Sequence, residues 1–306
     1  MGFEDFLAEL KDESASPRYS QLLQLSALPS ESLQEFKAVW PLVSEERKRA
    51  VIGQLVDLSE DNLELDFSSV FKVSLADKEA GVREMAVRGL WESEDRTVIR
   101  PLLRLLEKDP ATEVRATAAA ALGKFAELAR DGKLITQDES RIQAAIIAAI
   151  GRDGEDLEVR RRAIEAIASL DSPLRDRIIQ AAYDSGDSRL LQSSIYAMGR
   201  SADVDWLPTV VKETGHESPA IRYEAAVACG HLGNEGVVPH LISLLQDEDL
   251  QVQLAAVKAL GEVGGPLAKR ALNRCLEMED EVIEQAAEEA LGDIEFDEDP
   301  LALRFD

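Results

Sequence analysis

Two stretches, "IRYEAAVACGHLGN" at residues 221–234 and "VQLAAVKALGEVGG" at residues 252–265, share one pattern of residue types. Each begins with an aliphatic residue and has alanine at +4 and +7, an apolar residue at +8 and glycine at +9. Positions 0, +4, +7 and +8 fall on one side of a helix with 3.6 residues per turn. Each stretch is therefore predicted to be a helix with a narrow buried side of small and aliphatic residues. The glycine at +9 is expected to permit close packing of a neighbouring helix and to end the helix.

The same helix recurs along the chain at a nearly constant interval. Its first residue is found at Val82, Val114, Val159, Leu190, Ile221, Val252 and Ile283. Successive intervals of 32, 45, 31, 31, 31 and 31 residues indicate an internal structural repeat. Pro101, Pro208 and Pro239 each stand 13 residues before one of these positions and predict the first turn of a preceding helix. The repeat unit is thus expected to be helix, turn, helix.

The stretch "DPATEVRATAAAALG" at residues 109–123 carries the pattern D-x-x-x-x-V-R-x-x-A-x-x-A-L-G. This pattern resembles the short bacterial HEAT-like repeats, the kind first associated with phycobilisome lyases, and the resemblance covers roughly residues 60–295. It implies an all-α fold: a right-handed α-solenoid of stacked HEAT-like helix-turn-helix repeats with a period of 31 residues.

Two repeats have an aspartate six residues before the arginine at +1: Asp77 before Arg83, and Asp109 before Arg115. The resemblance implies that this structural Asp–Arg ladder ties the turn between the helices to the second helix. The alternative is a basic stripe that binds phosphate groups. We favour the ladder, because the chain as a whole has a net charge of −25.

Three segments are expected: an N-terminal helical cap with a degenerate repeat at residues 1–60, the repeat array at 61–295, and an acidic C-terminal tail at 296–306. The interval of 45 residues places an insertion near 129–141, where Thr136 and Glu139 are expected to form a capping box. The insertion is interpreted either as neutral extra length or as a functional loop. The tail is either a solubilising segment or a short docking motif.

The net charge of −25 argues against nucleic acid as a partner, because such binding depends mainly on neutralising phosphates with Lys and Arg. A partner protein of basic or apolar character is expected instead. No stretch approaches the length of a membrane span, and the start "MGFEDFLAELKDE" lacks the apolar core of a signal peptide, so we expect a cytoplasmic protein without membrane insertion.

The sequence offers little that predicts catalysis or metal binding. It has three histidines, and His216–Glu217 is the single His–Glu pair. Deoxyhypusine hydroxylase, which is built on similar repeats, holds two irons with several such pairs. We therefore predict no metal site, no catalytic residues and no cofactor. His216 is interpreted as a variant turn residue, since it stands where other repeats have Asp77, Asp109 and Asp247.

In HEAT-like arrays the second helix of each unit usually lines the concave side, and its outward positions are +2, +3, +6 and +10. Most of these positions are polar or small here. The exceptions, with their basic neighbours, form a candidate partner-binding patch: Tyr196, Arg200, Tyr223, Val227, His231 and Leu254. Tyrosine and arginine are typical anchors of protein interfaces, although ordinary packing between adjacent helices is the alternative interpretation.

The sequence thus predicts a non-enzymatic protein–protein interaction scaffold or adaptor. The alternative is a HEAT-like protein of the phycobilisome-lyase type, an enzyme subunit or chaperone that handles a bilin or another tetrapyrrole.

Overall fold

The computed structural model of the 306-residue chain describes residues 2–12, 18–233, 235–278 and 280–298. In these ranges it contains α-helices and short 3-10 helices joined by turns, and no β-strand. The all-α, helix-turn-helix architecture predicted from the sequence is confirmed. The chain divides into two compact units, Met1–Leu170 and Asp171–Asp306, which are described separately.

The first unit contains ten α-helices among its described residues. They are α1 (Phe3–Leu10), α2 (Tyr19–Leu22), α3 (Ser30–Val39), α4 (Glu45–Asp61), α5 (Ser68–Ser74), α6 (Ala80–Gly89), α7 (Ile99–Lys108), α8 (Thr112–Arg130), α9 (Thr136–Gly151) and α10 (Leu157–Ile167). Single 3-10 turns at Leu23–Leu25, Trp40–Leu42 and Arg96–Val98 adjoin α2, α3 and α7.

The second unit contains eight α-helices in its described part. They are α11 (Arg175–Tyr183), α12 (Ser188–Arg200), α13 (Leu207–Glu213), α14 (Pro219–Leu232), α15 (Val238–Leu244), α16 (Leu250–Val263), α17 (Gly265–Cys275) and α18 (Glu281–Glu298). Short 3-10 turns at Val204–Trp206 and Glu235–Val237 precede α13 and α15. Pro208 and Pro239 lie in the first turns of α13 and α15, as the sequence predicts.

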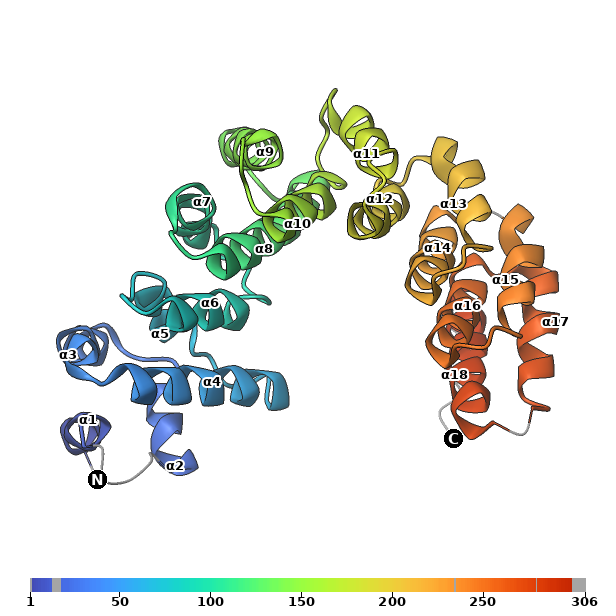
Figure 1. Ribbon diagram of the computed structural model, residues 1–306. Helices are drawn as coiled ribbons and strands as arrows, with labels where there is room; N and C mark the ends of the chain where they lie inside the picture. Colours follow the sequence, from blue (N-terminus) through green and yellow to red (C-terminus); the bar gives the residue numbers. More distant parts are fainter. Residues whose placement is uncertain (1, 13–17, 234, 279, 299–306) are drawn as a thin grey trace. The chain divides into compact units, whose positions relative to one another are not determined.

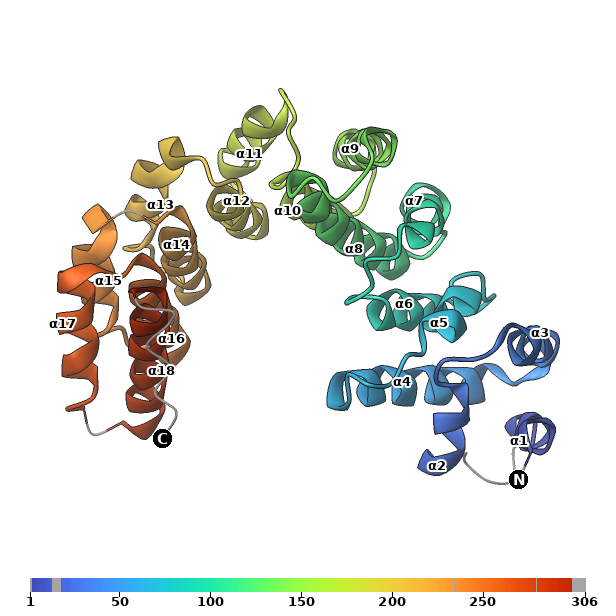
Figure 2. The ribbon, with the colours of Figure 1, turned by 180° about the vertical axis from the view of Figure 1, so that it is seen from behind.

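The helices of each unit form two layers (Figure 1). In the first unit α4, α6, α8 and α10 lie side by side in one layer, and α3, α5, α7 and α9 form the other. In the second unit α12, α14, α16 and α18 form one layer and α11, α13, α15 and α17 the other. The view from behind shows the same division (Figure 2). The layer of second helices is the one that carries the candidate patch.

The repeated apolar side of the second helices forms the core between the layers. Six of the seven first positions are buried, and the seventh, Leu190, is half-buried. Burial of one large aliphatic side chain contributes about 1.5–3 kcal/mol. One unit cannot bury its stripe alone, so this stabilisation depends on the neighbouring helices.

Glycine at +9 sets the distance between neighbouring second helices. These glycines lie inside α8, α12, α14 and α16, which continue past Gly123, Gly199, Gly230 and Gly261. A Cβ atom at Gly199 would lie 2.7 Å from the Cα of Ala228, and one at Gly261 would lie 2.9 Å from the Cβ of Ala290. The predicted close packing is confirmed. The prediction that these glycines end the helices is wrong, because the approach of the next helix is what requires them.

The insertion predicted near residues 129–141 consists mainly of helix. α8 has 19 residues and α9 has 16, whereas α12 has 13 and α11 has 9. Residues 131–135 are all that separate α8 from α9. The predicted capping box of Thr136 and Glu139 is wrong, because the N-cap of α9 is Ile135 and no side chain caps the helix.

The two ends of the array continue the same arrangement. α4 packs against α6 in the layer of second helices, where a degenerate repeat was expected. At the other end α18 extends to Glu298, so residues 296–298 of the predicted tail are helical. Residues 299–306, the rest of the tail, lie outside the described part of the chain.

Candidate functional site

The six residues of the candidate patch lie on three consecutive second helices of the second unit. Tyr196 and Arg200 are on α12; Tyr223, Val227 and His231 are on α14; and Leu254 is on α16. We call this surface the α12–α14–α16 patch. Tyr223 is 38 % exposed, His231 is exposed and the other four residues are half-buried. None of the six belongs to the core.

The helix periodicity explains why these side chains reach the surface. On α12 the neighbouring residues Ile195 and Met198 are fully buried, and on α14 the residues Ala225 and Cys229 are fully buried. The patch positions at +2, +6 and +10 stand on the other side of each helix from positions 0, +4, +7 and +8. Tyr223 is therefore directed away from the core by the same periodicity that buries Cys229.

The three helices are close enough to present one continuous surface. The Gly199–Ala228 approach brings α12 against α14, and a Cβ at Gly230 would lie 3.0 Å from the Cα of Ala259 on α16. Polar contacts also cross the helices at the edges of the patch. Gln192 Nε2 donates to Glu224 Oε1 at 3.1 Å.

The surroundings of the patch are acidic on the C-terminal side. His231 Nδ1 lies 3.5 Å from Glu262 Oε2, and Lys258 Nζ lies 4.0 Å from Glu262 Oε1. On α18 the outward positions +6 and +10 are Glu289 and Asp293, both exposed. A ligand that covers the aromatic residues would therefore have carboxylates beside it, which favours basic groups at that side.

The arginines at +1 are held within the protein. Arg83 Nη1 donates to the backbone carbonyl oxygens of Asp77 and Lys78, both at 2.9 Å. Its Nε and Nη2 atoms donate to the two carboxylate oxygens of Asp109, both at 2.7 Å. Hydrogen bonding to Asp109 raises the pKa of Arg83. The Asp77 carboxylate accepts instead from Lys48 Nζ at 2.8 Å, so the side-chain pairs join successive repeats.

The same double contact recurs further along the chain. Arg115 Nη1 donates to the carbonyl oxygen of Asp109 at 2.9 Å, and its Nη2 donates to Glu155 Oε1 at 2.7 Å. Arg222 donates to both carboxylate oxygens of Asp247, at 2.6 and 2.7 Å. These hydrogen bonds lower the pKa of Asp247. The guanidinium groups of Arg83, Arg115 and Arg222 are occupied by protein acceptors, which leaves them little capacity for an external phosphate.

His216 has the turn geometry of the aspartates that it replaces. Its Nδ1 atom accepts a hydrogen bond from the Ser218 backbone N–H at 3.0 Å. Asp109 Oδ1 accepts in the same way from the Ala111 backbone N–H at 3.0 Å. The interpretation of His216 as a turn residue is confirmed. In the ladder, the arginine at +1 of one repeat pairs with the turn aspartate of the next repeat. At this step leucine, Leu191, replaces the arginine and His216 replaces the aspartate, so both partners are changed.

Within the described residues, no group of three or more His, Cys, Asp or Glu side chains is placed to hold a metal ion. Cys229 and Cys275 are both buried, and burial raises the pKa of the Cys229 thiol to about 12. A thiol with such a pKa is a poor nucleophile near neutral pH. No helix in the described ranges is both long enough and apolar enough to cross a membrane.

Comparison with known proteins agrees with the architecture. The family model for HEAT repeats matches residues 69–151 and 207–292, together more than half of the chain. The protein therefore belongs to the HEAT-repeat family. No curated protein matches its sequence significantly.

Several solved structures are similar to this chain at low sequence identity. The complex of CpcE and CpcF of phycocyanin lyase from Nostoc sp. PCC7120 is 18% identical, covers 74% of this chain and 93% of its own, and has a TM-score of 0.48. Human deoxyhypusine hydroxylase in complex with glycerol is 16% identical, with 96% of both chains covered and a TM-score of 0.37. The Escherichia coli protein YibA is 17% identical, covers 83% of this chain and 97% of its own, and has a TM-score of 0.44.

Proposed function

We propose that this protein is a non-enzymatic scaffold or adaptor that binds a partner protein on the α12–α14–α16 patch. The observation that carries the proposal is the exposure of Tyr223, at 38 %, on a helix whose neighbours on both sides also present tyrosine or aliphatic side chains. Tyrosine and arginine are enriched among the residues that dominate binding energy at protein interfaces.

The repeat architecture supports a binding role. Stacked repeats hold outward residues at fixed spacing, while those residues are free to vary without loss of the core. Tyr196 and Tyr223 occupy outward positions on adjacent helices, at +6 and +2, where the units outside the α12–α14–α16 patch have polar or small residues. Two rigid rings on adjacent helices offer a large contact area at a small cost in conformational entropy.

Charge indicates the character of the partner. Glu262, Glu289 and Asp293 flank the patch toward the C-terminal end of the unit. We expect a partner segment with apolar residues against the tyrosines and basic residues toward these carboxylates. Attraction of this kind raises the association rate and falls with added salt.

The first experiment identifies what touches the patch. A photo-crosslinking amino acid is placed at Tyr223 in the organism that makes the protein, and a control is placed at exposed His240 on α15, in the other layer of the same unit. We expect a crosslinked protein at Tyr223 that is absent at His240. Equal labelling at both positions would contradict the proposal.

The second experiment measures how much Tyr196 and Tyr223 contribute to the binding free energy. Tyr196→Ala combined with Tyr223→Ala should weaken binding of the identified partner by about 2–4 kcal/mol, as loss of interface anchors does. Tyr19→Ala is the matched control, because Tyr19 is 60% exposed in the other unit. Urea unfolding checks that the double variant is folded; full affinity, or loss of the fold, would refute this assignment.

The tetrapyrrole-handling alternative is tested on the same variants. Bilin or haem is mixed with the purified protein, and the visible absorption spectrum is recorded. A stoichiometric spectral change that Tyr196→Ala with Tyr223→Ala abolishes would replace the scaffold proposal by a chromophore-binding one.

A further inference from the structure

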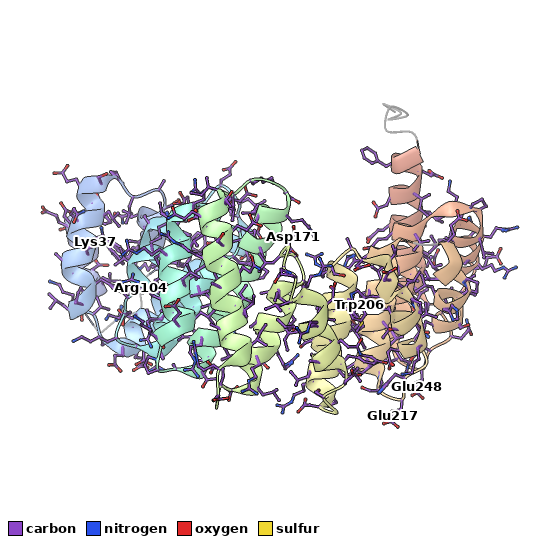
Figure 3. All side chains as sticks on the ribbon, turned by 90° about the horizontal axis from the view of Figure 1, so that it is seen from above. Lys37, Arg104, Asp171, Trp206, Glu217 and Glu248 are labelled. Carbon is purple, nitrogen blue, oxygen red and sulfur yellow. The ribbon has the colours of Figure 1, made fainter. Side chains whose placement is uncertain are left out.

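A groove lined by arginine lies between α7 and α9 in the first unit. It has a volume of about 630 Å³. It is lined by Arg96, Arg100, Arg104 and Arg141, together with apolar residues that include half-buried Leu103 and exposed Ala148. Figure 3 labels Arg104 on α7, the helix that forms one wall. The groove is thus lined by basic side chains together with apolar or small ones.

The groove departs from the charge of the rest of the chain. The protein has 34 basic and 59 acidic residues, yet four arginines line this groove against two carboxylates, Asp138 and Glu107. Asp138 is already engaged, because Arg96 donates to its Oδ2 atom from Nη2 at 2.6 Å and from Nε at 3.0 Å. Arg141 Nη1 lies 3.9 Å from the other oxygen of the same carboxylate.

Two of the arginines have no partner in the described part of the chain. Arg100 and Arg104 are exposed, and neither makes a hydrogen bond or an ion pair there. They stand four residues apart on α7, where like charges destabilise a helix slightly. These two guanidinium groups thus make no polar contact that stabilises the described fold, whereas the ladder arginines Arg83 and Arg115 donate to protein acceptors.

Guanidinium groups in this arrangement recognise carboxylates well. The planar fork of arginine donates two parallel hydrogen bonds to one carboxylate. Arg100 and Arg104 lie one helical turn apart, so they match carboxylates one turn apart on a helix packed beside α7. The exposed methyl groups of Ala144 and Ala148 on α9 leave room for small apolar side chains between the two walls.

We propose that the α7–α9 groove binds an acidic amphipathic helix of a partner protein. Carboxylates of that helix pair with Arg100 and Arg104, and its apolar side lies on Leu103, Ala144 and Ala148. A long nucleic acid fits less well, because its phosphates would meet the strongly acidic remainder of the chain beyond the groove. The groove and the α12–α14–α16 patch lie in different units and favour ligands of opposite charge.

The test uses a fluorescent probe and two charge-matched variants. The probe is a labelled helical peptide of three to four turns, made of Glu, Ala and Leu with Glu along one side. Arg100→Glu with Arg104→Glu changes the groove. Arg177→Glu with Arg274→Glu is the control, because these exposed arginines lie on α11 and α17 and give the same change in net charge.

Anisotropy titration of the full chain is expected to show binding that the groove variant weakens about tenfold or more, since two attractions become repulsions. The control variant should bind like the parent. Binding should also weaken at about 1 M NaCl, where the Debye length is about 3 Å.

Three results would overturn the proposal: no binding of the peptide by the parent, equal weakening in both variants, or tighter groove-dependent binding of random duplex DNA or phosphatidylserine vesicles than of the peptide. If the double reversal does not fold by circular dichroism, Arg100→Gln with Arg104→Gln is measured against Arg177→Gln with Arg274→Gln, and the same outcomes decide.

Discussion

Replacing Gly199 by alanine tests whether glycine at +9 serves helix spacing. The added Cβ would lie 2.7 Å from both the Cα and the Cβ of Ala228 on the next helix. Ordinary contacts of this kind are 3.4–4 Å, so α12 and α14 would have to separate by roughly 1 Å. The obstacle is backbone and a methyl group, and neither can rotate away.

The size of the effect follows from two opposing contributions. Forcing one extra carbon into a packed interface costs about 1–3 kcal/mol. Alanine is favoured over glycine inside a helix by about 1 kcal/mol. We expect Gly199→Ala to lower the free energy of unfolding by up to about 2 kcal/mol, which is the upper end of the difference between the two contributions.

Gly292 provides the matched control, because it holds the same repeat position in α18 and a Cβ there would meet no atom within 4 Å in the described part of the chain. Gly292→Ala should therefore raise stability by up to about 1 kcal/mol. The assay is urea unfolding followed by circular dichroism, where slopes of about 1–3 kcal/mol per M translate these changes into clear midpoint shifts. The reasoning fails if Gly199→Ala raises stability as Gly292→Ala is expected to do, or if both substitutions destabilise equally.

Two further predictions concern buried polar groups. Asp247→Asn should cost roughly 1.5–3 kcal/mol at neutral pH, because it weakens the charged pair with Arg222. The pKa of Asp247 is lowered in the folded state, so its contribution is present above its unfolded pKa of about 3.9 and is lost as the pH falls below that value. Urea unfolding of parent and variant from pH 7 to pH 3 should show the difference shrinking; a constant difference would contradict the pairing. Cys229, whose pKa burial raises to about 12, should react with a thiol reagent only after urea unfolding, and rapid reaction of the native protein would show that α14 is not packed as described.

The repeat could be predicted from sequence because its information is local. A stripe at 0, +4, +7 and +8 and a proline 13 residues earlier predict a helix and its preceding partner without reference to distant residues. The same periodicity predicts which side of α14 is buried, and Cys229 is in the core while Tyr223 is exposed. Binding at the α12–α14–α16 patch stays a prediction.

Side-chain contacts between repeats could not be predicted from such local sequence patterns. Asp77 and Arg83 are six residues apart and suggest a pair, yet Asp77 accepts from Lys48 of the preceding repeat and Arg83 donates to Asp109 of the next. The composition of the turn does not say which of several acids a long side chain will reach. Packing of one repeat on another decides it.

The sequence by itself determined the helix-turn-helix unit, its period and its buried stripe, because helix periodicity acts over a few turns of one segment. The tertiary structure decided the α7–α9 groove, whose Arg96 and Asp138 are 42 residues apart and meet only when two first helices pack together. The spacing of four between Arg96, Arg100 and Arg104 was visible in the sequence. That spacing predicts only that the three arginines lie along one wall of the groove. The second wall is α9, and only the packing of α9 beside α7 brings it there.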